Sequence, residues 1–357
     1  MSLLLSHTDP KQIVLAQQIF DEQFDQDAKL DREMDDRRKQ LMFQDILYNF
    51  SFLSTAVSLE DDQIFSSYAL WLYELLCNLM KDLSRPRIMN QMLDHYRILK
   101  SFTAKLFLPE AAEFAEFCID RACAVTESAV DNPPTVEKEF SGPYYSLCTA
   151  YLDALMKSNT AEAIAVIQQA DQSGLPLEDL FEQVIAPAMH EIGERWHQNK
   201  ITVDKEHYCT STTQMVLSLF YPKIFSSTAG SSSRTLITCC VGSELHEMGG
   251  RMVSDLFEYH GWDSIYLGAA VPVPSLLHAI DEYYPQLVSL SVTMPQYLDS
   301  CRDAVYAIRE ARPSIRIAVG GRAFSTSNSI YKRWPIDVYT TKATELISWA
   351  DQMVPAS

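Results

Sequence analysis

The spacing of hydrophobic residues differs between the two ends of the chain. Over residues 1–131, apolar side chains recur mostly every three or four positions, which places them on one side of a helix. The clearest run is Phe65, Tyr68, Ala69, Leu72, Leu75, Leu76 and Leu79. Pro86 and Pro109 fit helix starts, where a missing N–H does no harm. We therefore predict an all-helical N-terminal domain over 1–131, with helices near 62–83, 86–106 and 109–128.

A proline-rich break separates this region from a second helical one. The run Asp131-Asn132-Pro133-Pro134-Thr135 is typical of a linker. Beyond it the helical spacing returns. The pattern predicts a four-helix unit over 140–223, with helices near 143–158, 160–172, 177–198 and 203–221.

Strand-like segments begin after the Ser- and Gly-rich linker at 226–233. Short apolar runs rich in β-branched residues then alternate with helical segments near 247–260, 274–284, 297–311 and 342–353. The expected strands are Thr235–Val241, Ser264–Leu267, Leu287–Val292, Ile315–Val319 and Val338–Thr341. Largely apolar strands alternating with helices indicate a parallel sheet covered on both faces. The predicted fold is thus α/β plus all-α, and residues 234–357 form a flavodoxin-like (Rossmann-like) domain with a five-stranded parallel sheet.

Charge and cysteine content narrow the classes of function. A net charge of -18 over 357 residues argues against nucleic-acid binding through broad phosphate contact. The eight cysteines form no CxxC pair and lie mostly in apolar stretches, which is typical of reduced thiols in a cytoplasmic protein. Neither a secretory signal nor an uninterrupted apolar run long enough for a membrane span is visible.

The loop after the first predicted strand carries the candidate chemistry. Ligands of this fold bind beyond the carboxyl ends of the strands, and this loop opens the first helix. It lacks a GxGxxG fingerprint for phosphate binding and instead presents His246 between Glu244 and Glu247. A lone histidine is more often structural or merely exposed. A neutral imidazole at this edge is nevertheless a good transition-metal ligand, and a nearby carboxylate can fix its orientation.

Three spaced motifs resemble those of corrinoid-binding domains. That family carries Asp-x-His-x-x-Gly, then about 41 residues, Ser-x-Leu, a further 26–28 residues, and Gly-Gly. This chain has Glu244-x-His246-x-x-Gly249, Ser291-x-Thr293 after 41 residues, and Gly320-Gly321 after 26 more. Each motif lies at or just after a predicted strand.

The resemblance implies that this region binds cobalamin. His246 would replace the cofactor's own benzimidazole below cobalt, and the displaced tail would slot beside the sheet. Ser291 would hydrogen-bond the tail, and Gly320 and Gly321 would leave room for it. Glu244 and Thr293 depart from the family's Asp and Leu, which weakens any inference of ordinary methyl-transfer function.

The second helical unit resembles the cap of the CarH-type light-sensing repressors. It carries Trp196-His197 and, with nine residues between Trp196 and Glu206, the pair Glu206-His207. From the residues alone, Trp196 could equally be a core anchor, and His207 a capping or surface residue. The resemblance implies that Trp196 and Glu206 surround the adenosyl group of adenosylcobalamin. It also implies that His197 becomes the upper cobalt ligand after light breaks the cobalt–carbon bond.

The resemblance covers 140–357 and leaves the N-terminal domain unassigned. CarH-type proteins carry a winged-helix DNA-binding domain there, whereas this region is acidic and aromatic-rich, so we do not expect direct DNA binding. One alternative is a helical interaction or dimerisation domain. The layout also resembles photocobilins, which pair a cobalamin domain with a bilin-binding one. Aromatic residues such as Tyr48, Tyr68 and Trp71, together with His95 and Arg97, motivate that second alternative.

These observations predict a cobalamin-dependent photoreceptor or signalling protein without enzyme activity of its own. Its output would run through a protein partner or self-association. The main alternative is a corrinoid methyl carrier that serves a methyltransferase. A third is a cobalamin-binding regulator that does not respond to light.

Overall fold

The computed structural model describes residues 9–131, 140, 142–226 and 234–354. The predicted linkers at 131–135 and 226–233 fall almost entirely outside these ranges. The chain divides into two compact units, Met1–Thr135 with Ser325–Asn328, and Val136–Phe324 with Ser329–Ser357. The second unit contains both the predicted cap and the predicted sheet domain.

The first unit is helical, as its hydrophobic spacing predicts. Aspartate or serine side chains at residues 9, 35, 61 and 84 each accept a backbone N–H at the start of a helix. The predicted helix at 86–106 is interrupted at Phe102, which ends one helix and begins a short one. The helices are α2 (Pro10–Gln26), α3 (Leu30–Glu33), α4 (Asp36–Ser58), α5 (Asp62–Leu79), α6 (Arg85–Ser101), α7 (Thr103–Leu106) and α8 (Pro109–Asp131).

A polar cluster lies in the interior of this helical unit. Both ring nitrogens of His95 are engaged, Nδ1 with Gln23 Oε1 at 3.0 Å and Nε2 with Asn49 Nδ2 at 3.3 Å. Burial lowers the pKa of His95 to about 4, so its imidazole is neutral near pH 7. His95 therefore has a structural role in the core, whatever else the unit binds.

Asp45 of α4 is a partly buried carboxyl group in the same helical unit. Burial raises its pKa from the ordinary 3.8 to about 7. Its charge in turn helps to raise the pKa of Tyr68 and Tyr96, whose rings are buried from α5 and α6, although their own burial is the larger cause. Ionising Asp45 therefore opposes folding of this unit.

Replacing Asp45 by Asn should stabilise the protein, and more so in alkaline buffer. Because the folded-state pKa lies above the unfolded value, the penalty for ionisation is absent in acid and grows as pH rises through about 4 to about 7. We expect a gain on the order of 1–3 kcal/mol at about pH 8 and a smaller gain at about pH 5.5. Denaturant titrations at both pH values measure it, with the exposed Asp25→Asn as control. Equal gains at both pH values would contradict the assignment.

The cap is a bundle of helices in the second unit. It comprises α9 (Tyr145–Met156), α10 (Thr160–Gln172), α11 (Leu177–Asp179), α12 (Ala186–His197), α13 (Val203–Ser218) and α14 (Tyr221–Ser226). The predicted helix at 177–198 contains a π-helical stretch, Leu180–Ile185, directly before Pro187. Pro187 has no N–H to donate to the carbonyl of Gln183. In a regular α-helix the proline ring would also clash with that carbonyl. Cys148 Sγ donates to that carbonyl instead, at 3.0 Å.

The sheet has the predicted parallel, doubly wound topology. Its strands are β1 (Thr235–Val241), β2 (Asp263–Val271), β3 (Leu287–Ser291), β4 (Arg316–Gly320) and β5 (Val338–Tyr339), in the order β2-β1-β3-β4-β5. Six of the seven β1 residues are buried, as expected for a strand covered on both faces. β2 is longer than predicted because it continues through Gly268 and Ala270, which have positive φ and accompany shifts in its register with β1.

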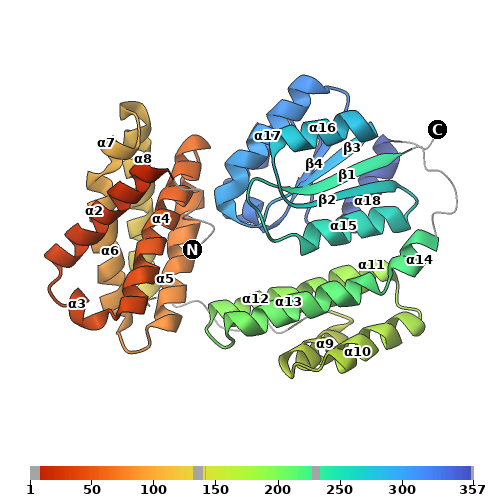
Figure 1. The fold of residues 1–357 in the computed structure, drawn as a ribbon, viewed down its shortest axis with the longest axis horizontal. Coiled ribbons are helices and arrows are strands. Elements are labelled where there is room, and N and C mark those ends of the chain that lie inside the picture. The colour runs from red at the N-terminus through yellow and green to blue at the C-terminus, as the bar shows by residue number, and fades with distance from the viewer. Residues whose placement is uncertain (1–8, 132–139, 141, 227–233, 355–357) are drawn as a thin grey trace. The chain divides into compact units, whose positions relative to one another are not determined.

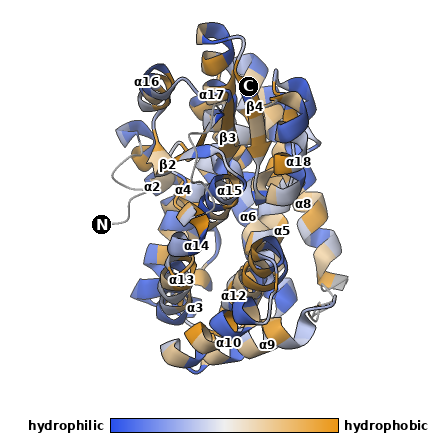
Figure 2. Cartoon of the chain, turned by 90° about the vertical axis from the view of Figure 1, so that its right-hand side faces the viewer, coloured by the Kyte–Doolittle hydropathy of each residue, from blue (hydrophilic) through white to orange (hydrophobic). Residues whose placement is uncertain are grey.

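Helices cover both faces of this sheet. Helices α15 (Met248–Tyr259) and α18 (Ala343–Met353) pack together on one face, and α16 (Val273–Tyr283) and α17 (Leu298–Ala311) on the other. Figure 1 shows α15 and α16 on opposite sides of the strands. In Figure 2 the strand β4 is coloured as hydrophobic, whereas the helices alternate between hydrophobic and hydrophilic residues.

The cap and the sheet domain share one hydrophobic core. Buried residues of the cap, such as Phe181 and Ile192, belong to the same cluster as Phe257 of α15 and Leu346 of α18. Polar contacts reinforce this packing. The carboxylate of Glu182 accepts both the backbone N–H and the hydroxyl of Thr344 at the start of α18, at 2.9 and 2.8 Å. The cap is therefore fixed over the α15 and α18 face.

Candidate functional site

The three motif segments meet at the carboxyl edge of the sheet. In the strand register, Cys240 of β1 pairs with Ser291 of β3, which pairs with Gly320 of β4. Ser291 and Gly320 thus lie in one row across neighbouring strands, and the loop with His246 begins two residues after Cys240. Residues that are spaced far apart in the sequence therefore lie close together at this edge of the sheet.

The carboxylate of Glu244 holds the candidate cobalt ligand. Its Oε1 accepts the Nδ1–H of His246 at 2.7 Å and the backbone N–H of the same residue at 2.9 Å. Its Oε2 accepts the backbone N–H groups of Thr293 and Met294 at 2.8 and 2.7 Å. Glu244 is completely buried, and these four bonds satisfy both oxygens.

The pKa shifts of Glu244 and His246 follow from these hydrogen bonds. Burial opposes ionisation of Glu244, but the hydrogen bonds from His246 and from backbone N–H groups outweigh it and lower its pKa. The hydrogen bond to Glu244 raises the pKa of His246 against the effect of burial. A carboxylate on Nδ1 places the neutral ring's proton there and leaves the Nε2 lone pair for a metal. The His246 side chain is 60% exposed, so an approaching ligand can reach it.

Gly250 of α15 packs closely against Ser291, beside which the resemblance places the cofactor's tail. A Cβ built on Gly250 of α15 would meet Ser291 Cβ, Cys240 Sγ and Thr238 Cγ2 at 3.5–3.7 Å, so only small side chains lie between α15 and the sheet. The buried Thr238 Oγ1 has no hydrogen-bond partner within the described part of the chain. A hydroxyl of this kind suits a polar tail. In the sequence, Thr238 is visible only as a polar residue inside an apolar strand.

The three motif glycines differ in what surrounds them. A Cβ on Gly321, whose φ is +102°, would lie 2.2 Å from Val292 O, and one on Gly320 would lie 2.9 Å from Thr340 O. Close approach of backbone is therefore sufficient reason for both glycines, independently of any room left for a tail. Gly249 has open space around its Cβ position.

Glu206 of the cap lies within electrostatic range of the same loop. Its charge contributes to the raised pKa of His246, so the α13 N-terminus lies within electrostatic range of the imidazole. Its carboxylate is fixed by His207 Nδ1 at 2.7 Å and by Thr210 Oγ1 at 2.8 Å. This brings together one residue from each of the two predicted halves of the site.

The tryptophan–histidine pair occupies the end of α12. Trp196 is half-buried, whereas the His197 side chain is only 8% exposed, with Nδ1 3.9 Å from Glu194 Oε1. Asn199 then adopts a left-handed conformation, which ends the helix before α13 begins at Val203. In this conformation His197 is part of the cap's interior packing.

Sequence reasoning missed His190, one turn and a half before Trp196 on α12. Desolvation by neighbouring groups and the nearby positive charge of Arg322 lower the pKa of His190, although its side chain is exposed to solvent. Arg322 directly follows the Gly320-Gly321 motif. Only the fold could reveal this pair, since 131 positions separate the two residues along the chain.

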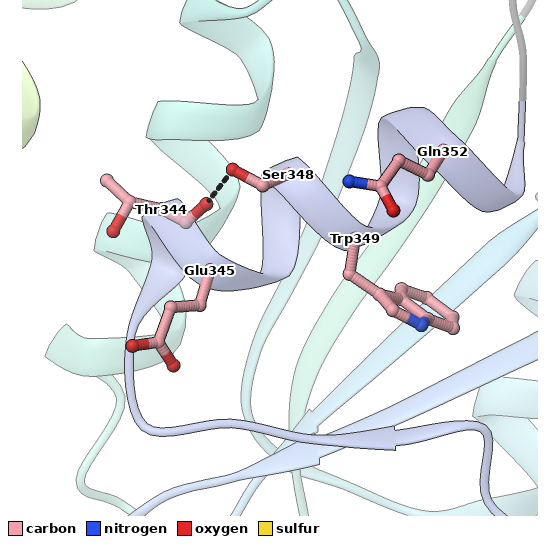
Figure 3. A pocket seen from close by; sticks show the side chains of 5 residues that line it. All are labelled: Thr344, Glu345, Ser348, Trp349 and Gln352. Carbon is pink, nitrogen blue, oxygen red and sulfur yellow. Dashed lines mark hydrogen bonds between the residues drawn. The ribbon is translucent and has the colours of Figure 1, made fainter.

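Other hollows of the described surface lie elsewhere. One is lined by Thr344, Glu345, Ser348, Trp349 and Gln352, all on α18, as Figure 3 shows. Another lies between the end of β2 and α16. Among the described residues, no three or more His, Cys, Asp or Glu side chains gather as a metal site, and no described helix is long and apolar enough to cross a membrane.

Comparison with known families identifies the second unit. Residues 234–345 match the B12 binding domain family, and residues 147–221 match a second B12 binding domain family. The chain is a cobalamin-binding protein. The two matched regions correspond to the sheet domain and to the helical cap, so the Glu244–His246 loop lies within a B12 binding domain.

Individual relatives fall into two groups. The chain is 27% identical over 168 residues to the HTH-type transcriptional repressor CarH of Myxococcus xanthus, a match that covers 47% of this chain and 55% of that protein. It is 19% identical over 204 residues to a dimethylamine corrinoid protein of Methanosarcina barkeri, covering 57% and 94%. The solved structure of the Methanosarcina barkeri monomethylamine corrinoid protein shares the fold, with a TM-score of 0.52, 16% identity and coverage of 59% of this chain and 100% of that one. The protein is thus CarH-like and has the fold of corrinoid proteins.

Removing the imidazole should impair cobalamin binding. We expect His246→Ala to weaken binding at least about tenfold, or to leave the cofactor's own benzimidazole on cobalt, because no other ring nitrogen of the loop replaces Nε2. Absorbance titration in the dark measures both the affinity and the axial ligand. His278→Ala, on α16, is the matched control. An unchanged affinity and spectrum for His246→Ala would refute the assignment.

Proposed function

We propose that this protein is an adenosylcobalamin-dependent photoreceptor that signals through protein contacts. His246 would hold the lower face of cobalt. Trp196 and Glu206 of the cap would surround the adenosyl group above it, with Thr293, Ser291 and the motif glycines along the tail. When bound, adenosylcobalamin supplies a cobalt–carbon bond that light can cleave.

The observation that carries this proposal is the position of Glu206. Its carboxylate belongs to the cap but acts on the pKa of His246 across the site. It also accepts hydrogen bonds from His207 and Thr210. A fixed acceptor suits the hydroxyl groups of a nucleoside, whereas it offers nothing to a methyl group. The similarity to CarH supports the same reading.

His197 is the proposed light-dependent ligand. Because its side chain is now packed in the cap, reaching cobalt at ~2 Å would require the end of α12 to move. Such a movement would disturb the shared core with α15 and α18, and so change surfaces available to a partner or to another copy of the chain. This links bond cleavage to an output without an enzymatic step.

A corrinoid methyl carrier is the second candidate. The dimethylamine corrinoid protein is matched over 94% of its length, which favours this alternative. A carrier would place a methyl group above cobalt and present it to a methyltransferase. Trp196 and Glu206 would then have no nucleoside to contact, so the upper ligand distinguishes the two functions.

A bilin in the N-terminal unit remains a separate proposal. Within the described residues, Asn49 Oδ1 and Tyr96 OH are buried without a hydrogen-bond partner, and a chromophore's N–H groups would suit them. A visible absorbance band in protein purified without cobalamin would support it. The alternative, an interaction domain, predicts no such band.

Illumination separates the leading functions. The full chain is loaded with adenosylcobalamin in the dark, its absorbance and molecular mass are recorded, and both are recorded again after green light. The photoreceptor proposal predicts a protein-bound photoproduct with a new spectrum and a changed mass or shape. Release of free aquocobalamin, or no binding of the adenosyl form, would contradict it.

Variants of the cap sharpen this test. His197→Ala should preserve dark binding within about twofold but alter the spectrum of the light product, because only the illuminated state uses that imidazole. His278→Ala serves as the control, since it removes an exposed imidazole of α16 that lies outside the cap. An identical light product in His197→Ala would exclude His197 as the upper ligand.

A further inference from the structure

The carboxylate of Asp45 in the helical unit has no cationic partner. Among the described residues, no hydrogen bond or ion pair engages its side chain, and burial is the cause of its raised pKa. The helix α5, which packs against α4, contains no lysine or arginine. An acid that is costly to ionise and has no counter-charge within the unit is suited to a positively charged ligand.

Aromatic side chains surround this carboxylate. Its charge contributes to the raised pKa of Tyr48 on α4, Tyr68 on α5 and Tyr96 on α6, so three phenol groups lie within its electrostatic range. Phe52 stacks on the Tyr68 ring at a centroid distance of 3.8 Å, which holds that ring in place. Within the described chain, no lysine or arginine lies over the rings of Tyr48 and Tyr68. Ring faces of this kind attract cations.

Two buried groups of the same unit also lack partners. Asn49 and Tyr96 are 2% and 0% exposed, and neither Asn49 Oδ1 nor Tyr96 OH has a hydrogen-bond partner among the described residues. Asn49 lies one turn after Asp45 on α4, and its Nδ2 donates to the Asp45 carbonyl at 2.8 Å. The Asp45 carboxylate, Asn49 Oδ1 and Tyr96 OH can all accept a hydrogen bond, so a ligand that donates suits them.

We propose that the helical unit binds a small protonated alkylamine at Asp45. The carboxylate balances the charge and, with Asn49 Oδ1, accepts N–H groups of the ammonium. The rings of Tyr48 and Tyr68 pack against the alkyl part. Asp45 and Tyr48 are both partly exposed, so a small ligand can reach them from solvent. This site is independent of cobalamin, and it differs from the bilin proposal because an alkylamine has no visible absorbance.

Calorimetric titration of the full chain without cobalamin tests the proposal with three probes. Isobutylammonium should bind at about pH 8 with a Kd of about 1 mM or tighter. Isobutanol has the same skeleton without the charge, and tetramethylammonium has the charge without an N–H, so each should bind at least about tenfold more weakly. No binding of isobutylammonium, or equal binding of either other probe, would overturn the proposal.

The affinity for isobutylammonium should also depend on pH through Asp45. Because its folded-state pKa is about 7, Asp45 is mostly ionised at about pH 8.5 and mostly protonated at about pH 5.5, so the affinity should fall about 30-fold between these values. An alkylamine stays protonated over this range, as lysine does. An affinity that is constant, or that rises in acid, would contradict the proposal.

No other group around Asp45 changes its charge in this pH range. Within the described chain, no charged side chain of α2, α5, α6 or α8 acts on the pKa of Asp45. His95 remains neutral because its pKa is about 4, and the three phenols remain neutral because their pKa values are raised. The Cys123 thiol of α8, which acts on Tyr96, has a pKa of about 11 and also remains neutral.

Two variants locate the site. Asp45→Asn keeps the shape of the side chain and removes its charge, so it should weaken isobutylammonium binding at least about tenfold and abolish the pH dependence. Because the same change is expected to stabilise the protein, weaker binding cannot be attributed to unfolding. Asp25→Asn, at an exposed position of α2, is the matched control and should bind like the unmodified protein. Unchanged affinity in Asp45→Asn, or an equal loss in Asp25→Asn, would refute the site.

Discussion

The hydrogen bonds of one buried carboxylate, Glu244, hold the candidate cobalt ligand His246 in place. A fully buried ion is tolerated only when every lone pair has a partner, and here four N–H groups supply them. The same bonds choose the tautomer of His246 and orient its free nitrogen. The parallel sheet contributes by bringing the loops after β1 and β3 to one edge.

The cap depends on that edge being fixed. Its helices share a core with α15 and α18, and the carboxylate of Glu182 sits at the start of α18. The charge of Glu206 consequently helps to raise the pKa of His246 from a cap that is held in place. A change of the ligand above cobalt would act on α12. A π-helical stretch precedes this helix and interrupts the α-helical hydrogen bonding before Pro187. A change of the cobalt ligand could therefore alter the packing of the cap against α15 and α18.

Much of the fold followed from periodicity, since β1 and the helices of the sheet domain begin and end within a residue or two of their predicted bounds. Where prediction differed, a local cause is visible. Gly268 and Ala270 have positive φ, and the second half of β2, which contains them, was not predicted. The π-helical stretch before Pro187 was not predicted either, and the Cys148 thiol that bonds the Gln183 carbonyl there comes from another helix. In the site, spacing located His246, Ser291 and Gly320 together. It could not show that Glu244 reaches a second loop, that Gly321 is required by the Val292 carbonyl, or that His197 is packed inside the cap.

The central claim is that this chain holds adenosylcobalamin between His246 and the end of the cap. A crystal structure of the full chain with adenosylcobalamin, grown and frozen in the dark, tests it most directly. The account predicts His246 Nε2 bonded to cobalt at ~2 Å, with Glu244 still on Nδ1 and the adenosyl group between Trp196 and Glu206. Benzimidazole nitrogen on cobalt, with His246 turned away, would contradict it.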